Sequence, residues 1–261
     1  MGIITAPLPK RKLGSTDCWV SPIGLGTVKL GRNQQVKYPQ PFALPDDRAV
    51  KKLLETAAEL GVNLIDTAPA YGLSEARLGQ WLPGKRSDWH LATKVGEEFI
   101  DGQSHFNFSE KHIVLSVERS LQRLRTDYLD TVLIHSHGDD VTLIKRYGVL
   151  DILATLKRKG WVRCIGMSTK TVEGGVLALA SSDVVMATYN LEHTAEIPVL
   201  ETAALHGKAV WIKKAFASGQ VQTTEKIQAT FEALSVFSAV SSVIIGTLNP
   251  EHLRENIYNF R

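Results

Sequence analysis

The feature that most constrains the fold is a regular alternation of short β-branched runs with longer amphipathic segments. Eight short runs are each followed by a segment whose apolar residues recur at helical spacing. This alternation is typical of βα units around a parallel sheet, because each helix carries the chain back to the start of the next strand. The sequence therefore predicts eight consecutive βα units.

The units can be placed along the chain. The expected strands are Ile23–Gly26, Asn63–Asp66, His90–Lys94, Thr131–His135, Val162–Ser168, Val184–Thr188, Ala209–Lys213 and Ser242–Gly246. The helices expected after them are Asp47–Leu60, Ser74–Leu82, Ser109–Arg125, Val149–Lys159, Val172–Ala180, Ile197–His206, Thr224–Phe237 and Pro250–Tyr258. Asn249 before Pro250, and Ser109 before a run of regularly spaced apolar residues, are capping signals. Ahead of the first unit, Arg11–Val20 holds a Gly-Ser-Thr turn and is expected to form a β-hairpin that closes one end of a barrel.

Eight units in 261 residues favour an α/β fold of the (β/α)₈ TIM-barrel type, with one domain over residues 1–261. No internal repeat, linker or low-complexity segment divides the chain. An open doubly wound sheet is the structural alternative, but it normally carries G-x-G-x-x-G after its first strand. Here Gly24 and Gly26 are followed by Lys29 at the third glycine position.

Composition narrows the classes of partner and compartment. The formal net charge is only +3 and the basic residues are scattered, so no nucleic-acid footprint is present. No segment reaches the roughly 18 apolar residues of a membrane span, and the N-terminus is too briefly apolar for a signal peptide. Cys18 and Cys164 lie far apart without C-x-x-C spacing, which indicates neither a disulfide framework nor a zinc site. We therefore expect a cytoplasmic protein, a monomer or weak homo-oligomer, with no nucleic-acid or membrane partner.

Four polar residues stand at or just past the ends of expected strands, in the segments LIDTAPAY, HLATK and DTVLIH. They are Asp66, Tyr71, Lys94 and His135. In a βα barrel, chemistry is located at the C-terminal ends of the strands, so these side chains are expected to meet there. A tyrosine beside an ammonium and a buried carboxylate is suited to donate a proton to a carbonyl oxygen.

The segments around these residues resemble the aldo-keto reductase superfamily. The resemblance extends over nearly the whole chain and rests chiefly on GVNLIDTAPAYG and RLRTDYLDTVLIH, supported by LATKVG, KGWVRCIGMS and IIGTLNPEHLREN. It implies hydride transfer from a nicotinamide cofactor to an aldehyde or ketone, a small-molecule carbonyl substrate. It also implies that Asp66, Tyr71, Lys94 and His135 are the catalytic residues.

The physical chemistry of the four agrees with that implication. A free tyrosine titrates near 10, and a neighbouring cation favours the phenolate, so Lys94 is expected to lower the pKa of Tyr71. Asp66 would compensate the charge of Lys94 in a partly dry pocket, because a lone buried charge is costly. His135 would hydrogen-bond the carbonyl oxygen and hold it within reach of Tyr71 and the hydride.

The resemblance also assigns residues to the cofactor. They are Gly26, Thr27, Asp66, Ser168, Thr169, Met186, Lys213, Lys214, Phe216, Ser218, Gly246, Thr247, His252, Arg254, Glu255 and Asn256. Several depart from the family pattern: Thr169 and Met186 replace amide side chains that clasp the nicotinamide carboxamide, and Lys213 stands where an aromatic is frequent. Lys213 and Lys214 are interpreted as partners of the pyrophosphate.

The coenzyme is expected to be NADP(H), with NAD(H) left open. In NADP-using relatives basic residues surround the 2′-phosphate, whereas here Gly246 replaces the first of them. His252 and Arg254 remain as candidates, and Asn256 would meet the adenine.

Aromatic side chains in the loops Lys29–Pro45, Gly96–Phe108 and Ser136–Tyr147 suit a medium-sized carbonyl compound.

Two other functions stay open. His135-Ser136-His137 is an H-x-H at a strand end, as in metal-dependent barrel hydrolases, although no third ligand is evident. The altered carboxamide clasp would also fit a non-catalytic protein that binds or senses a nicotinamide cofactor.

Overall fold

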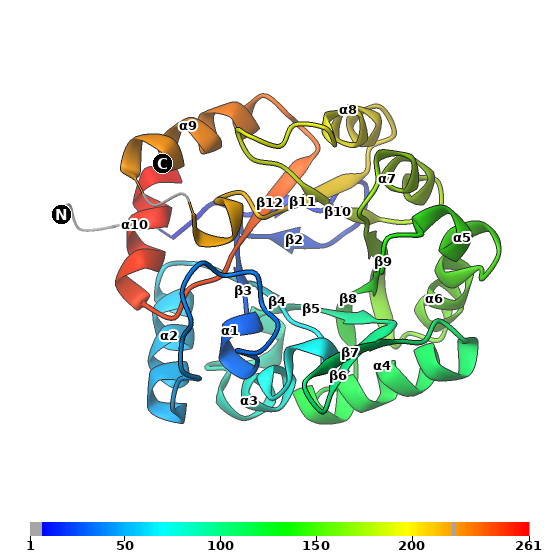
Figure 1. Cartoon of the computed structure of the whole chain (residues 1–261), viewed down its shortest axis with the longest axis horizontal. Helices are drawn as coiled ribbons and strands as arrows, with labels where there is room; N and C mark the ends of the chain where they lie inside the picture. Colours follow the sequence, from blue (N-terminus) through cyan, green and yellow to red (C-terminus); the bar gives the residue numbers. More distant parts are fainter. Residues whose placement is uncertain (1–6, 221–222, 261) are drawn as a thin grey trace.

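A computed structural model describes residues 7–220 and 223–260. Eight parallel strands form a closed barrel with helices around it (Figure 1). The strands, in barrel order, are β3 (Ile23–Gly26), β4 (Leu64–Asp66), β5 (His90–Val95), β8 (Leu129–His135), β9 (Val162–Ser168), β10 (Val184–Thr188), β11 (Ala209–Lys213) and β12 (Val240–Ile245). The expected (β/α)₈ barrel is confirmed, and each strand boundary lies within two residues of its expected position.

The helices that return the chain between strands also follow the predicted pattern. They are α2 (Asp47–Glu59), α3 (Ser74–Trp81), α4 (Glu110–Leu124), α6 (Val149–Arg158), α7 (Val172–Leu179), α8 (Ile197–Leu205), α9 (Thr224–Ser235) and α10 (Pro250–Phe260). Both predicted caps form: Ser109 Oγ accepts from the His112 amide, and Asn249 Oδ1 accepts from the Glu251 amide at 3.0 Å. None of the described helices is long and apolar enough to cross a membrane.

The hydrophobic core has two layers, because every strand of a closed barrel is buried on both faces. The outer layer lies between the strands and the helices. The inner layer fills the barrel and consists of Leu13, Cys18, Val20, Leu64, Ala92, Leu133, Cys164, Val184, Met186, Ala209 and Trp211. The barrel is therefore a packed core, and ligands have access only at its ends.

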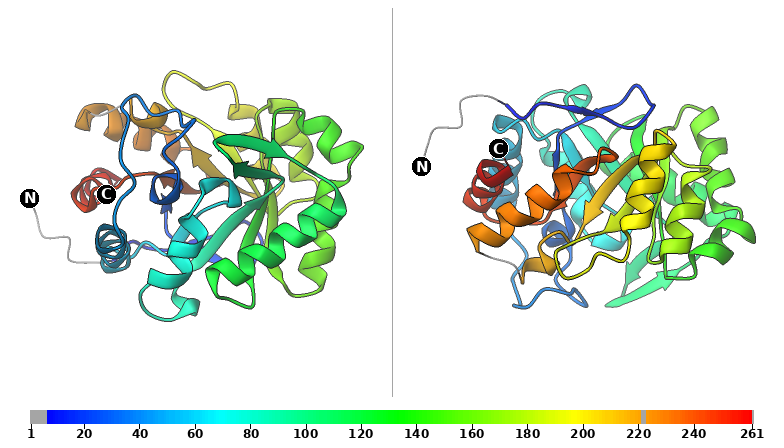
Figure 2. Two further views of the ribbon diagram at one scale, coloured as in Figure 1. Left: turned by 60° about the horizontal axis from the view of Figure 1, so that its bottom comes forward. Right: turned by 90° about the horizontal axis from the view of Figure 1, so that it is seen from above.

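The predicted hairpin closes the N-terminal end of the barrel. Its strands β1 (Arg11–Lys12) and β2 (Trp19–Val20) pair antiparallel. In the right-hand view of Figure 2 this blue hairpin lies at the top, opposite the green hairpin at the other end. Gly14 in its turn has φ +55°, and a Cβ there would lie 2.7 Å from the carbonyl oxygen of Gly207, so a side chain would clash.

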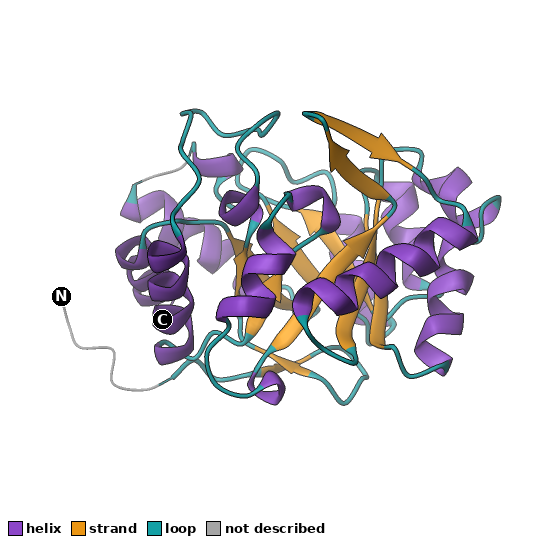
Figure 3. Ribbon diagram, turned by 90° about the horizontal axis from the view of Figure 1, so that it is seen from below, coloured by secondary structure: helices purple, strands orange, loops and turns teal. Residues whose placement is uncertain are grey.

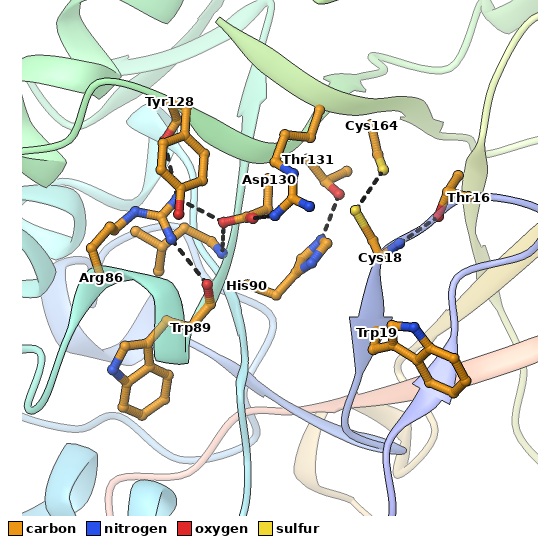
Figure 4. Close-up of polar contacts among 12 residues, drawn as sticks. Thr16, Cys18, Trp19, Arg86, Trp89, His90, Tyr128, Asp130, Thr131 and Cys164 are labelled. Atoms are coloured by element: carbon orange, nitrogen blue, oxygen red, sulfur yellow. Dashed lines mark hydrogen bonds and ion pairs between the residues drawn. The ribbon is translucent and has the colours of Figure 1, made fainter. Parts of the chain in front are cut away.

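Polar side chains anchor the same end of the barrel (Figure 4). The Asp130 carboxylate receives Arg86 at 2.6 Å and Arg163 at 3.0 Å, and His90 Nε2 lies 2.8 Å from Thr131 Oγ1. Burial lowers the pKa of His90 to about 4, so this imidazole is neutral at physiological pH. These contacts join β5, β8 and β9 near their N-terminal ends.

The loops at the opposite end hold elements beyond the eight predicted units. They are the helices α1 (Val28–Gly31) and α5 (Asp140–Lys145), the 3₁₀ turns η1 (Pro69–Tyr71) and η3 (Ala217–Gly219), and the hairpin β6 (Glu97–Ile100) with β7 (Gln103–Phe106), whereas the turn η2 (Arg86–Asp88) leads into β5 at the N-terminal end. This second hairpin projects beyond the barrel, at the top of Figure 3. Asp101 and Gly102 form its turn, both with positive φ, and Asp-Gly is a hairpin signal readable from the sequence. We call β6–β7 the flap.

Candidate active site

The strand register gathers the predicted catalytic residues at the C-terminal rim of the barrel. Asp66 ends β4, Lys94 is the penultimate residue of β5, His135 ends β8, and Tyr71 lies in η1 directly after β4. Adjacent strands hold these ends level, since Asp66 pairs with Ala92 and His135 pairs with Ser168. All four catalytic candidates line a cavity of about 1430 Å³.

The Lys94 ammonium is fully engaged. Its Nζ donates to Asp66 Oδ1 at 2.6 Å, to the Thr67 carbonyl oxygen at 3.0 Å and to Tyr71 Oη at 3.0 Å. An ammonium has three N–H donors, so each has one acceptor. Because Tyr71 Oη accepts from Lys94, its own proton remains available for another acceptor in the cavity.

The charges of this group act in different directions on its two titratable partners. Burial alone would lower the pKa of Lys94, but Asp66 and Tyr71 outweigh it, so the pKa of Lys94 lies above its ordinary value. Burial raises the pKa of Tyr71, Lys94 partly opposes this, and Asp66 adds to it. Lys94 lowers the pKa of Tyr71, as expected, but the net shift of that pKa is upward. The depth of burial of Tyr71 could not be inferred from the sequence, so its effect on the pKa was not predicted. Tyr71 is therefore protonated at neutral pH.

His135 faces Tyr71 and contacts a carboxylate from the flap. The rings of Tyr71 and His135 meet edge to face with centroids 6.1 Å apart. His135 Nδ1 lies 2.8 Å from Glu97 Oε2, a contact that becomes an ion pair when the imidazole is protonated. Burial lowers the pKa of His135 and Glu97 raises it, with a net shift below the ordinary value.

Glu97 is itself held by neighbours. Ser104 Oγ donates to Glu97 Oε1 at 2.6 Å, and the Arg32 guanidinium lies 3.6 Å from the same oxygen. Burial would raise the pKa of Glu97, but His135, Ser104 and Arg32 outweigh it and hold that pKa at about 2. The carboxylate is therefore ionised in any ordinary buffer.

Arg32 fastens the flap to the catalytic loop. Its NH1 donates to the Ala70 carbonyl oxygen at 3.1 Å, and its guanidinium stacks 3.7 Å from the ring centroid of Phe99. The sequence analysis missed both Glu97 and Arg32. The Asp-Gly turn could have indicated the flap, but no sequence signal showed that Glu97 would reach His135.

The structure brings most of the predicted cofactor residues to the same cavity. Its lining includes Gly26, Asp66, Ser168, Met186, Lys213, Lys214, Phe216, Ser218, Gly246, Thr247, His252, Arg254, Glu255 and Asn256. Thr27 and Thr169 are buried away from it: Thr27 Oγ1 donates to the Asp66 carbonyl oxygen at 2.9 Å, and Thr169 Oγ1 is buried without a hydrogen-bond partner. Thr169 can thus contribute little side-chain contact to a ligand in this conformation.

The Lys213 ammonium lies at the cavity wall and contacts the end of β9. Its Nζ donates to Ser168 Oγ at 3.0 Å and to the Thr169 carbonyl oxygen at 2.5 Å. Burial lowers the pKa of Lys213 to about 8, although Glu196 pulls it upward. Burial also lowers the pKa of the neighbouring Lys214. Both lysines place positive charge at this wall of the cavity.

The candidates for 2′-phosphate recognition lie on α10. Arg254 already contacts two carboxylates, Glu59 at 3.2 Å and Glu251 at 3.4 Å, and its side chain is 34% exposed. Asn256 Nδ2 donates to the His252 carbonyl oxygen at 2.7 Å, while its Oδ1 is buried without a hydrogen-bond partner. An amide oxygen left unpaired at a cavity wall is ready to accept from a ligand.

Within residues 7–220 and 223–260, no group of three His, Cys, Asp or Glu side chains could hold a metal ion. The second histidine of the H-x-H packs against two aromatic rings: the His137 ring lies 5.7 Å from that of Phe106 and 5.1 Å from that of Phe108. His137 therefore serves the packing of the flap base.

A closed βα barrel with a polar cavity at its C-terminal rim is the architecture of barrel enzymes. The chain belongs to the aldo/keto reductase family, whose model matches residues 22–235. Members of this family generally bind nicotinamide cofactors and act on small carbonyl compounds.

Similar proteins agree with this assignment. A putative aldo-keto reductase from Pseudomonas aeruginosa is 47% identical, with a TM-score of 0.90 over 99% of this chain and 97% of that one. The holo form of an aldo-keto reductase from Bacillus halodurans shares the fold at 24% identity, with a TM-score of 0.81 over 97% of this chain and 90% of that one. Methylglyoxal reductase from Salmonella typhimurium is 30% identical over 71% of this chain and 68% of its own length.

D-arabinose 1-dehydrogenase from Saccharomyces cerevisiae is 36% identical over 57% of this chain. That match covers 43% of the yeast protein, and the chain spans about half the length of several other relatives that it matches.

Proposed function

We propose that this protein reduces an aldehyde or ketone by hydride transfer from NADPH, with Tyr71 as the proton donor. The observation that carries the proposal is the hydrogen bond from Lys94 to Tyr71 Oη. Because the phenolic oxygen accepts in this bond, its own proton can be donated to a substrate. Tyr71 lines a cavity large enough for a cofactor and a small substrate together.

Each residue of the group has a defined part. NADPH, when bound, supplies the hydride to the carbonyl carbon. Tyr71 donates its proton to the oxygen, and Lys94 stabilises the phenolate that remains. Asp66 keeps Lys94 charged in the buried site, and His135 orients the carbonyl oxygen.

The cavity wall fits a dinucleotide. Lys213 and Lys214 supply positive charge that suits the nicotinamide end and the pyrophosphate, and the unpaired Asn256 Oδ1 is placed to accept from the adenine amino group. We propose NADPH rather than NADH because His252 and Arg254 line the same cavity. Arg254 would share its guanidinium between the 2′-phosphate and its present carboxylate partners.

The substrate is proposed to be a small or medium-sized carbonyl compound. Methylglyoxal reductase is among the relatives, and Tyr38 and Phe106 form an apolar wall of the cavity. Cytoplasmic location and a monomeric or weakly associated state remain predictions from composition alone.

A non-catalytic cofactor-binding role is the second candidate, and the placement of Thr169 away from the cavity favours it. Fluorescence titration with NADPH and NADH, followed by NADPH oxidation with an aldehyde panel, separates the two functions. Binding followed by multiple turnovers that Tyr71→Phe abolishes would support the reductase. Binding with no turnover on any aldehyde would support the sensor, and no binding of either coenzyme would overturn both.

A further inference from the structure

We propose that Glu97 is a positioning residue that orients the His135 ring and favours its protonated form, from which Nε2 can donate to the substrate oxygen. This inference rests on the proposed carbonyl reduction. It is carried by the 2.8 Å contact between His135 Nδ1 and Glu97 Oε2, and by the neighbours that hold the carboxylate.

The contact determines which ring nitrogen carries a proton. An ionised carboxylate accepts but does not donate, so Nδ1 must carry a proton to approach Glu97 favourably. In a neutral imidazole Nε2 then has a lone pair and cannot donate to a carbonyl oxygen. Only the imidazolium donates from both nitrogens, and Glu97 is the carboxylate that stabilises this form.

The charges around the ring show why that carboxylate is needed. The charged and titratable groups facing His135 are Glu97 on β6, Lys94 on β5, Lys213 on β11 and Tyr71 on η1. The two lysines and burial disfavour the imidazolium, whereas Glu97 favours it. Because Glu97 belongs to the flap and Arg32 ties the flap to the Tyr71 loop, the protonated form of His135 depends on the position in which these contacts hold the flap.

The test compares Glu97→Gln with Asp101→Asn, an isosteric loss of negative charge at the exposed turn of the same flap. The titration of His135 is followed by NMR of imidazole signals, assigned with His135→Gln. In Glu97→Gln we expect the His135 pKa to fall, since the group that raises it is gone, and the Nδ1-protonated tautomer to lose its preference. Asp101→Asn should leave both unchanged. An unaltered His135 titration in Glu97→Gln would overturn the inference.

Kinetics separates this inference from the proposed reaction. If the protein is a reductase, turnover should fall at a lower pH in Glu97→Gln than in the parent, with coenzyme Kd unchanged. Loss of coenzyme binding, or an unfolded protein, would indicate a structural role for Glu97 and contradict positioning. If the parent shows no turnover, the proposed function fails while the NMR result still decides the role of Glu97.

A second inference concerns the opposite end of the barrel and is independent of the first. We infer that Cys18 and Cys164 form a peroxide-reactive thiol pair that closes to a disulfide. Cys18 lies between the strands of the N-terminal hairpin and Cys164 lies on β9, and their sulfur atoms are 3.4 Å apart (Figure 4). The two residues are 146 positions apart in the sequence, and the spacing gave no indication of this contact.

The environment distinguishes the two thiols. The hydrogen bond donated by Cys164 is the largest cause that lowers the pKa of Cys18 to about 7, and Arg163 adds to it, whereas burial opposes. The pKa of Cys164 is raised by that same hydrogen bond and by burial. Cys18 is 6% exposed and Cys164 1%, so the oxidant must be small, as a hydroperoxide is.

The reaction balances in two steps. The Cys18 thiolate attacks hydrogen peroxide, the O–O bond breaks, and sulfenic acid and hydroxide form. The Cys164 sulfur then attacks the Cys18 sulfur, the S–O bond breaks, and a disulfide and water form. One peroxide thus oxidises two thiols. The hydroxide from the first step takes up the proton that Cys18 lost on ionisation and becomes a second water.

The test treats the intact protein with hydrogen peroxide. We expect loss of two hydrogen atoms by mass, a Cys18–Cys164 peptide under non-reducing conditions, reversal by dithiothreitol, and a rise in Tm on the order of 10 °C, because the long loop is closed. In Cys164→Ser, Cys18 should instead accumulate a dimedone-reactive sulfenic acid. Absence of a cross-link, or direct oxidation of Cys18 to sulfinic acid in the parent protein, would overturn the inference.

Discussion

Lys94 donates a 3.0 Å hydrogen bond to the hydroxyl of Tyr71, and this direction of donation decides what the tyrosine can do. The phenolic oxygen accepts from the ammonium, so its proton is not consumed within the group. At the same time burial raises the pKa of Tyr71, which keeps it protonated. Tyr71 therefore keeps its proton at neutral pH, and the Lys94 ammonium stabilises the phenolate that forms when Tyr71 donates it.

The first prediction concerns the proton donor. Tyr71→Phe removes only the hydroxyl, so fold and coenzyme binding should persist while turnover with aldehydes falls by about 10²–10⁴-fold. Steady-state kinetics and coenzyme titration measure the two effects separately. A Phe variant that reduces aldehydes at the parental rate would remove Tyr71 from the mechanism.

The second prediction concerns the charge of Lys94. Lys94→Met removes a contribution that lowers the pKa of Tyr71, so that pKa should rise further. Because Tyr71 acts in its protonated form, the alkaline limb of the residual pH–rate profile should move to higher pH, with the rate reduced at least about 100-fold. An active variant with the parental profile would contradict this role.

The third prediction concerns Lys213, whose pKa is lowered to about 8. The unfolded chain then binds more protons than the folded one between about pH 8 and 10.5, so this residue makes stability rise with pH in that window. Lys213→Met should abolish this rise and increase the free energy of unfolding at pH 7 by about 1–3 kcal/mol. Urea unfolding at pH 7 and 10 measures the effect. If the free energy of unfolding has the same pH dependence in the parent and in Lys213→Met, burial does not lower the pKa of Lys213.

The fourth prediction concerns coenzyme selection. Arg254 is partly exposed and already paired, so Arg254→Ala should weaken NADPH binding by only about 1 kcal/mol, roughly fivefold, and leave NADH binding unchanged. His252→Ala should also weaken NADPH binding and leave NADH binding unchanged, because NADH lacks the 2′-phosphate. If neither variant changes the NADPH to NADH preference, the phosphate is bound elsewhere or the coenzyme is NADH.

The sequence by itself determined the barrel and the order of its units. Each strand and helix is specified by local periodicity, caps and turns, which act within a few residues and are readable without the fold. The same patterns placed Asp66, Lys94 and His135 at strand ends, and a parallel barrel brings strand ends to one rim.

The tertiary structure alone decided which groups meet across the chain. Glu97, which begins the flap directly after β5, meets His135 at the end of the neighbouring β8, and Cys18 meets Cys164 because the hairpin residue packs into the inner core. The net pKa shift of Tyr71 also followed from burial. Such contacts depend on loop conformation and packing over long sequence separations, and local periodicity carries no information about them.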